Sequence, residues 1–192
     1  MNNSTKATLA ALCVVACLNG CGRPAPTGLV LTSYKNADQP QIYTINLDSC
    51  VYYQDAGGDY HFAGRDVHIS DQPDGGEIQQ LLHVHVFWKP IPGKTFDNAS
   101  SIDAIYRYVL ITQHGVAVYR GTGYVYPRKR RFSDRIRLEV DSGRLSLVGK
   151  STGQADIIEA ARLRGLLEAK SDRAAALDIR REIDILTGQV QQ

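Results

Sequence analysis

Two histidines separated by one residue, His83 and His85, are the residues whose type and spacing could bind a metal ion. On a strand, residues i and i+2 share a face, so two imidazoles there could hold one ion. A third ligand would have to come from His61, His68, His114 or an acid, and no second motif fixes one. A polar strand face with two solvated or hydrogen-bonded histidines is the simpler explanation, because this spacing alone is a weak signal for a metal site. We therefore expect no metal or other cofactor, and His83 and His85 remain the candidates if one binds.

His61 and His68 lie near a predicted turn, where exposed side chains are expected. Acidic residues in this region, such as Asp55 and Asp59, are explained by turn chemistry, because Asp side chains hydrogen-bond to nearby backbone groups. Residues 54–76 are rich in glycine and acids, as turns often are. We expect no catalytic role for them.

Four tyrosines are candidates for a binding surface. Tyr106 and Tyr108 would share one strand face, and so would Tyr124 and Tyr126. Such pairs could stack on sugars or line a protein interface. Core packing and cross-strand pairing would account for them as well, because aromatic residues favour strands in general.

A basic run at 128–131 could attract anionic lipid headgroups or phosphate-rich polysaccharide, or could be a solvated loop. Enzyme signatures do not occur: the chain has no GxSxG, HExxH, phosphate-binding or dinucleotide-binding motif. The fragment Gly121-Thr122-Gly123 lies in a strand context, where it indicates a bulge or the close approach of another backbone. The sequence therefore predicts a protein that is not an enzyme.

The elements that would position these residues are mostly strands. Residues 29–150 alternate apolar and polar positions between turn signals, which is typical of antiparallel sheets. In the run 78–88, even-numbered residues from Leu82 to Trp88 point one way and odd-numbered residues the other. The clearest hairpin joins 105–112 to 116–120 through a three-residue connection that contains a glycine.

The pattern changes to a helical one after Gly149. Apolar residues recur at helical spacing in 155–187, and Ser171-Asp172 between the two halves can end one helix and cap the next. Gly188 fits a helix C-cap. We expect a helical hairpin at 151–192, or one long kinked helix. Its apolar stripe would cover an open sheet face or pair with a second copy of the chain.

The fold class is therefore mainly β: an antiparallel β-sandwich or partly open barrel at 29–150, followed by the C-terminal helical hairpin. The small net charge of +2 argues against a nucleic-acid partner, because such proteins present a strongly basic face. Of the four cysteines, Cys13 and Cys17 lie in an apolar N-terminal segment. Cys50 fits a buried small side chain, and the alternative is a reactive thiol or an intermolecular disulfide.

The N-terminal segment indicates the cellular compartment in which the protein is expected to lie. An apolar run from Ala7 to Leu18 follows the single cation Lys6, and the run ends in Leu18-Asn19-Gly20-Cys21. The run is too short for a spanning helix and suits the core of a signal peptide. Residues 22–28 are rich in proline and glycine, which indicates a short tether.

This segment resembles the signal peptide of bacterial lipoproteins, whose lipobox ends in the cysteine that becomes acylated. The resemblance implies removal of residues 1–20, a diacylglycerol and a further acyl chain such as palmitate on Cys21, and anchorage to a membrane outside the cytoplasm. Gly22 would favour the outer membrane if the host has one. Cys17 ends a second possible lipobox, and the segment would also fit an ordinary secretory signal or a short buried helix. The stretch 82–126 resembles that of bacterial lipoproteins of unknown function.

These observations lead to three hypotheses about function. The first is a lipid-anchored cell-envelope protein that is not an enzyme and acts as a binding or structural module, with an envelope protein or polysaccharide as partner. The second is a metal-binding envelope protein or metalloenzyme that uses His83 and His85. The third is an oligomeric envelope component that assembles through residues 155–187.

Overall fold

The computed structural model describes most of the chain after residue 27. The described residues are 28–35, 38–69, 76–87, 104–129, 133–154, 158 and 160–190. The predicted signal peptide (1–20), the anchor residue Cys21 and the tether up to residue 27 lie outside them, as do Trp88 and residues 130–131.

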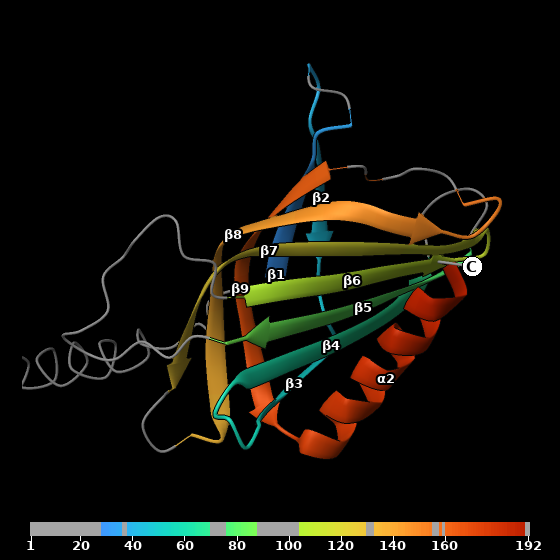
Figure 1. Ribbon diagram of the computed structural model, residues 1–192. Coiled ribbons are helices and arrows are strands. Elements are labelled where there is room, and N and C mark those ends of the chain that lie inside the picture. Colours follow the sequence, from blue (N-terminus) through green and yellow to red (C-terminus); the bar gives the residue numbers. More distant parts are fainter. Residues whose placement is uncertain are drawn as a thin grey trace, which may run out of the picture.

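Strands make up most of the described residues, so the predicted mainly β fold is confirmed. The strands are β1 (Gly28–Ser33), β2 (Gln41–Ile45), β3 (Ser49–Gln54), β4 (Tyr60–Ile69), β5 (Glu77–Val86), β6 (Ala104–Thr112), β7 (Gly115–Lys129), β8 (Arg135–Lys150) and β9 (Ala160–Ser171). One helix, α2 (Arg173–Val190), follows β9 (Figure 1). From β3 to β8, each strand pairs antiparallel with the next along the chain.

Strands β3 to β9 close into a barrel. β9 pairs antiparallel with β8 along most of its length, and its last two residues pair in parallel with β3, as Lys170 with Val51 and Ser171 with Tyr52. This short contact joins the two ends of the seven-stranded sheet. Of the two architectures expected, the structure shows a barrel rather than a sandwich, and the barrel is closed rather than partly open.

Strands β1 and β2 extend the sheet beyond the barrel. β1 pairs with the first half of β9, and β2 pairs with the free edge of β1. Leu29, Leu31 and Ile45 on these strands are at most 1% exposed and pack with the residues of the barrel interior. The β1–β2 hairpin therefore covers part of the barrel core.

Figure 1 shows β7 and β8 turning through a large angle, and glycines in the long strands allow neighbouring backbones to approach closely. At Gly121 in β7, a Cβ atom would lie 1.6 Å from the carbonyl oxygen of Arg144. At Gly165 in β9, φ is +134° and a Cβ atom would lie 2.3 Å from the carbonyl oxygen of Gly28. Only glycine fits either position. The predicted close approach of another backbone at Gly121 is confirmed.

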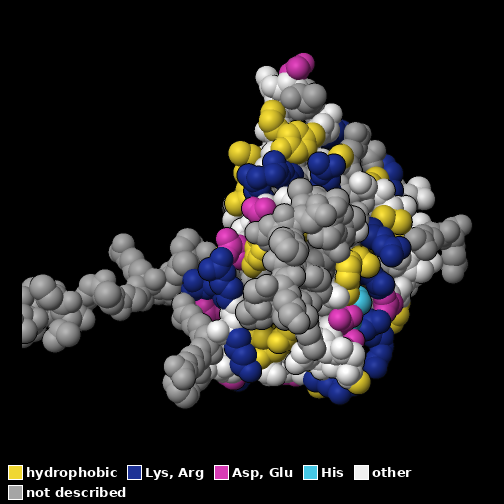
Figure 2. All heavy atoms as spheres, turned by 60° about the vertical axis from the view of Figure 1, so that its left-hand side comes forward, with side chains coloured by type: hydrophobic (Ala, Val, Ile, Leu, Met, Phe, Trp, Pro, Cys, Tyr) yellow, Lys and Arg dark blue, Asp and Glu magenta, His cyan; other side chains and the backbone are white. Residues whose placement is uncertain are grey.

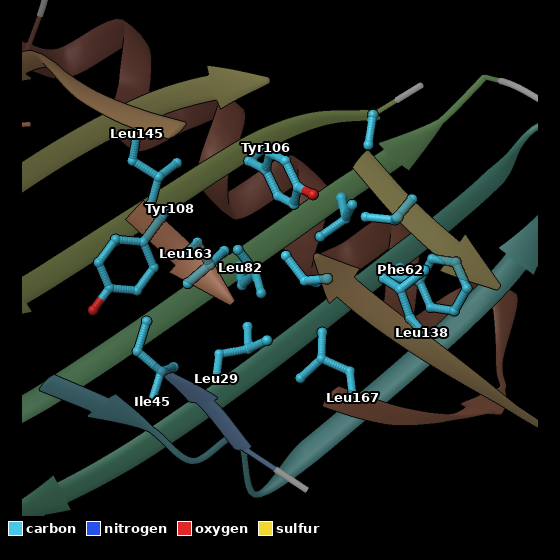
Figure 3. Close-up of a cluster of buried hydrophobic side chains, with 14 of the residues drawn as sticks. Leu29, Ile45, Phe62, Leu82, Tyr106, Tyr108, Leu138, Leu145, Leu163 and Leu167 are labelled. Carbon is cyan, nitrogen blue, oxygen red and sulfur yellow. The ribbon is translucent and has the colours of Figure 1, made fainter. Parts of the chain in front are cut away.

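Large apolar side chains fill the barrel interior (Figure 3). Those that are fully buried include Phe62, Leu82, Tyr106, Tyr119, Ile136, Leu138, Leu145 and Leu163. The alternation predicted in β5 is confirmed: Leu82, Val84 and Val86 belong to this interior cluster. The side chains of Leu81 and His83 point to the opposite, outer face.

The predicted hairpin between 105–112 and 116–120 is confirmed as β6 and β7. The connection is two residues long, Gln113 and His114, rather than three, because Thr112 pairs directly with Gly115. Gly115 has φ of +141°, which a residue with a side chain rarely adopts.

The helical hairpin predicted at 151–192 is wrong, because residues 160–171 form β9 and only one helix follows. Leu163 and Leu167 are both buried on the inner face of β9. They are four residues apart, which is about one helical turn but also two strand repeats, so this spacing fits both structures. Tertiary pairing decides between them: as a strand, β9 hydrogen-bonds to both β8 and β1.

Helix α2 begins after Asp172, whose carboxylate accepts a hydrogen bond from the N–H of Ala175 at 3.0 Å. The predicted cap at Ser171-Asp172 is therefore confirmed. Gly188 does not act as the C-cap, because the helix continues to Val190. In the part of the chain that the structure describes, no helix has both the length and the hydropathy of a membrane-spanning segment.

The apolar side of α2 packs on the outer face of the barrel. Its buried residues Ala176, Ile179 and Ile183 form a second cluster with outward-facing residues of the sheet. The sheet residues of this cluster are Tyr53, Ala63, Leu81, Val109 and Val118. The apolar stripe of the helix thus covers a sheet face. This was the first of the two expected alternatives, and the second was pairing with another copy of the chain.

Candidate functional site

Three histidines from neighbouring strands meet on the helix-covered outer face of the barrel. We call His61, His83 and His85 the histidine cluster. Strand register brings them together: His61 on β4 pairs with His85 on β5, and with Tyr53 on β3. His83 lies two residues before His85, on the same face. Paired residues on one face of a sheet have Cβ atoms about 5 Å apart, so their rings touch.

The rings of the cluster stack in a row. The ring centroids of Tyr53 and His61 are 4.6 Å apart with an interplanar angle of 8°. Those of His61 and His85 are 4.3 Å apart at 14°, and those of His61 and His83 are 5.5 Å apart at 14°. The guanidinium of Arg173, at the start of α2, lies 5.7 Å from the Tyr53 ring centroid. The helix thereby covers one end of the row.

Hydrogen bonds link the cluster to two aspartates of the β3–β4 turn. The Nε2 atom of His61 lies 3.3 Å from Oδ2 of Asp55, and Nε2 of His85 lies 3.0 Å from Oδ2 of Asp59. The N–H of Asp59 donates to Oδ1 of Asp55 at 2.9 Å. Both aspartates thus have turn roles, as expected, and they also orient histidines.

These contacts assign the protons of the cluster. An ionised carboxylate only accepts, so His61 donates from Nε2 to Asp55. The Nδ1 atom of neutral His61 is then an acceptor, and it lies 3.3 Å from Nε2 of His83, which donates to it. The three side chains form one chain of hydrogen bonds, Asp55, His61 and His83, that runs from the turn into buried structure.

The surroundings keep the inner histidines neutral. Burial, together with the nearby charges of His61, Arg107, Arg180 and His85, lowers the pKa of His83 from 6.5 to about 3. Burial also lowers the pKa of His61, against the opposing effect of its hydrogen bond to Asp55.

The carboxyl group of Asp55 has its pKa lowered. Desolvation acts to raise it, but hydrogen bonds from His61 and from the N–H groups of Asp59 and Gly58 prevail. At neutral pH, an anionic Asp55 therefore faces neutral His61 and His83.

The cluster does not form a metal site. His83 and His85 share a face as predicted, but their Nε2 atoms contact different partners, His61 and Asp59. Among the described residues, no group of three or more His, Cys, Asp or Glu side chains could hold a metal ion. The prediction that His61 is exposed is wrong, because His61 is 5% exposed.

The other two histidines lie elsewhere. His68 is half-exposed, and its Nδ1 atom lies 2.6 Å from Oδ2 of Asp66. His114 lies in the β6–β7 turn, where its Nε2 atom is 3.3 Å from the side-chain amide of Gln113. Of the five histidines, sequence spacing related only His83 and His85. The partnership with His61 depends on strand register, and the sequence carries no signal for it.

A polar network inside the barrel also has no signal in the sequence. The hydroxyl of Tyr108 donates to Oε1 of Gln80 at 2.7 Å, and Nε2 of Gln80 donates to Oδ2 of Asp66 at 3.1 Å. All three residues are at most 7% exposed. Burial raises the pKa of Tyr108 well above its usual range. The network satisfies the polar end of a core tyrosine.

The predicted tyrosine surface does not form as expected. Tyr106 and Tyr108 are 0% and 3% exposed and belong to the barrel interior, so they cannot present a binding face. Tyr124 and Tyr126 are half-buried. Core packing, the alternative to a binding surface, holds for the first pair. Strand alternation showed which tyrosines share a face but not which face is inside.

The basic run and Cys50 have unremarkable surroundings in the part that the structure describes. Arg128 lies near the end of β7 and forms an ion pair with Glu139 at 3.0 Å, so the run begins in a strand rather than in a loop. Cys50 is half-buried against the core. Burial raises the pKa of its thiol to about 12, which disfavours the reactive thiolate. The structure thus favours the buried small side chain for Cys50.

Comparisons with known proteins give no indication of function. No protein-family model, no curated protein and no solved structure matches the chain. What can be said of the site therefore follows from the contacts described above.

Proposed function

We propose that this protein is a lipid-anchored module of a bacterial cell envelope that binds a partner or supports envelope structure, and that it is not an enzyme. The observation that carries the proposal is the sequence Leu18-Asn19-Gly20-Cys21 at the end of a short apolar run. An acylated Cys21 would carry two or three chains, enough for stable attachment, whereas one chain holds a protein only marginally.

The short sequence distance between Cys21 and the first strand fits this proposal. Strand β1 begins at Gly28, seven residues after Cys21. A chain spans at most about 3.3–3.6 Å per residue, so Gly28 would lie within about 25 Å of Cys21 and the barrel would lie close to the membrane surface. At that distance its outer faces would meet the headgroups, polysaccharides and proteins of the envelope.

The histidine cluster supports a structural rather than a catalytic role. Its polar contacts among the described residues are to its own members, Asp55 and Asp59, and no hydroxyl or thiol nucleophile hydrogen-bonds to it. Nucleophilic catalysis requires such a contact between base and nucleophile. The stacked rings instead tie β3, β4 and β5 together beneath the start of α2. No contact of His83 or His85 favours the alternative metal-binding function.

Mass measurement and fractionation of the chain expressed in a bacterial host test the proposal. The wild type should have a mass that begins at Cys21 plus diacylglyceryl and acyl groups, and it should sediment with membranes. Cys21→Ser should remain unprocessed or unlipidated. The matched control is Cys17→Ser, which removes the other cysteine of the apolar segment and should be processed like the wild type.

Two results would contradict the proposal. A wild-type protein that is cleaved but carries no lipid would be a secreted protein without an anchor. Full-length protein in the cytosol would remove the envelope location altogether.

A further inference from the structure

A groove on the outer face of the barrel lies away from the histidine cluster. It runs over the paired first half of β9 and second half of β8, beside the end of β1, where the N–H of Tyr34 donates to the carbonyl of Ala160 at 2.9 Å. Its volume is about 420 Å³, within the range of small-molecule sites. Figure 2 shows Lys and Arg side chains gathered below the tip of the β1–β2 hairpin, which is the region of this groove.

Two arginines line the groove from opposite strands. Arg144 on β8 and Arg162 on β9 are direct cross-strand partners, so their side chains leave the same face of the sheet side by side. Like charges placed directly opposite each other destabilise a sheet. An anion between the two guanidinium groups would remove this repulsion.

Within the described part of the chain, no acidic group neutralises this pair. Among the described residues, neither Arg144 nor Arg162 has an ion pair or a hydrogen-bond partner for its guanidinium group. Other arginines of the barrel are paired: Arg65 with Glu182, Arg107 with Asp184, and Arg135 with Glu168. These three sheet arginines have acidic partners, whereas Arg144, Arg162 and Arg120 have none among the described residues.

The rest of the lining suits a small phosphorylated ligand. Ser142 and Ser146 place hydroxyl groups on the β8 side, where they can donate to oxygen atoms. Tyr34 and Ala160 add an aromatic and an apolar surface on the β1 and β9 side. Guanidinium groups form paired hydrogen bonds with phosphate oxygens, and aromatic rings pack on the apolar faces of sugars.

We propose that this groove binds a sugar phosphate, with its phosphate held between Arg144 and Arg162. The phosphate would accept hydrogen bonds from both guanidinium groups and remove their mutual repulsion. The sugar would lie against Tyr34, with its hydroxyl groups within reach of Ser142 and Ser146. This site does not depend on the lipid anchor, and its test is independent of the one for Cys21.

Calorimetric titration of the full chain, purified in an uncharged detergent, with glucose 6-phosphate is the first measurement. Arg144→Gln and Arg162→Gln should each weaken binding at least tenfold, because each removes a charge-assisted contact. Arg164→Gln is the matched control: it removes the same charge from the same strand, but Arg164 donates to the carbonyl of Asp141 at 3.0 Å and does not line the groove. It should change binding less than threefold.

Further ligands separate the sources of the phosphate. Glucose should not bind, and inorganic phosphate should bind more weakly than glucose 6-phosphate but with the same dependence on Arg144. Vesicles of phosphatidylglycerol mixed with phosphatidylcholine should bind the wild type and Arg144→Gln equally.

Several results would overturn the proposal. Equal weakening by Arg164→Gln would reduce the effect to net charge. Absence of glucose 6-phosphate binding at millimolar concentration would remove the site. Vesicle binding that depends on Arg144 without sugar phosphate binding would assign the groove to a lipid headgroup instead.

Discussion

Two pairs of arginines on the outer surface of the barrel have opposite electrostatic surroundings. Under α2, Arg65 and Arg107 form ion pairs with Glu182 and Asp184 of the helix. On the uncovered face, Arg144 and Arg162 stand opposite each other without an acidic partner among the described residues. The two arginines beneath the helix thus have their charges neutralised within the chain, whereas the charges of Arg144 and Arg162 remain available. The difference indicates that the first pair contributes to the fold, whereas the second is suited to an anionic ligand.

The packing of α2 gives the largest expected effect. Ile183 is 0% exposed in the contact between helix and sheet, so Ile183→Ala should lower the free energy of unfolding by about 2–5 kcal/mol, because it leaves a cavity. Ile185 on the same helix is 56% exposed, and Ile185→Ala should change the free energy of unfolding by less than about 0.5 kcal/mol. Urea unfolding measures both. Equal losses would mean that α2 does not hold the covered face as described.

Acid sensitivity should originate on the covered face. His83 has a pKa of 6.5 when unfolded and about 3 when folded, so the unfolded state binds more protons between these values. Stability should be full above about pH 6.5 and decline toward pH 3, with a slope of up to about 1.4 kcal/mol per pH unit from this group. The charges that oppose its protonation come from His61 and His85 on neighbouring strands, Arg107 on β6 and Arg180 on α2.

Urea unfolding at several pH values checks this dependence. His83→Gln should flatten the slope between pH 3 and pH 6.5, although the variant itself is less stable. His114→Gln, which changes a histidine exposed in a turn, should leave the slope as it is in the wild type. The idea fails if His83→Gln and the wild type lose stability in parallel as the pH falls.

The smallest effects should differ in sign between the two faces. Arg65→Gln removes an ion pair that is partly exposed and should lower stability by up to about 1 kcal/mol. Arg144→Gln removes a repulsion and should raise stability by about 0.2–1 kcal/mol in the absence of ligand. Both effects should shrink at high salt, because the side chains are accessible to solvent. Unfolding at low and high salt measures them, and a loss of stability in Arg144→Gln would remove the contrast.

Local patterns predicted the strands well and the C-terminal segment poorly. The alternation of β5, the β6–β7 hairpin and the cap at Asp172 follow from a few neighbouring residues, and the structure confirms them. The four-residue spacing of Leu163 and Leu167 fits both periods, so it predicts a helix where the structure has strand β9. Pairing with β8 and β1 decides its structure, and no local pattern encodes that pairing.

The candidate sites show the same difference: contacts within one strand can be predicted from the sequence, and contacts between strands cannot. The spacing of His83 and His85 predicted a shared face, which the structure confirms. Register places His61 beside His85, and it places Arg162 opposite Arg144. Each partner lies on another strand, so sequence distance gives no indication of contact. Burial of Tyr106 and Tyr108 likewise depends on which side of the sheet becomes the interior.

Closure of the barrel through two residue pairs has a consequence for how the chain folds. Strands β4 to β8 lie between Val51 and Lys170 in the sequence, so nearly the whole barrel separates these two partners. Contacts between residues so distant in sequence form slowly, because the entropy of a long loop must be lost first. Until β9 arrives, one edge of β3 has unpaired backbone groups that another chain could pair with. A chain emerging from a ribosome or a membrane channel therefore exposes this edge until its C-terminal residues are released.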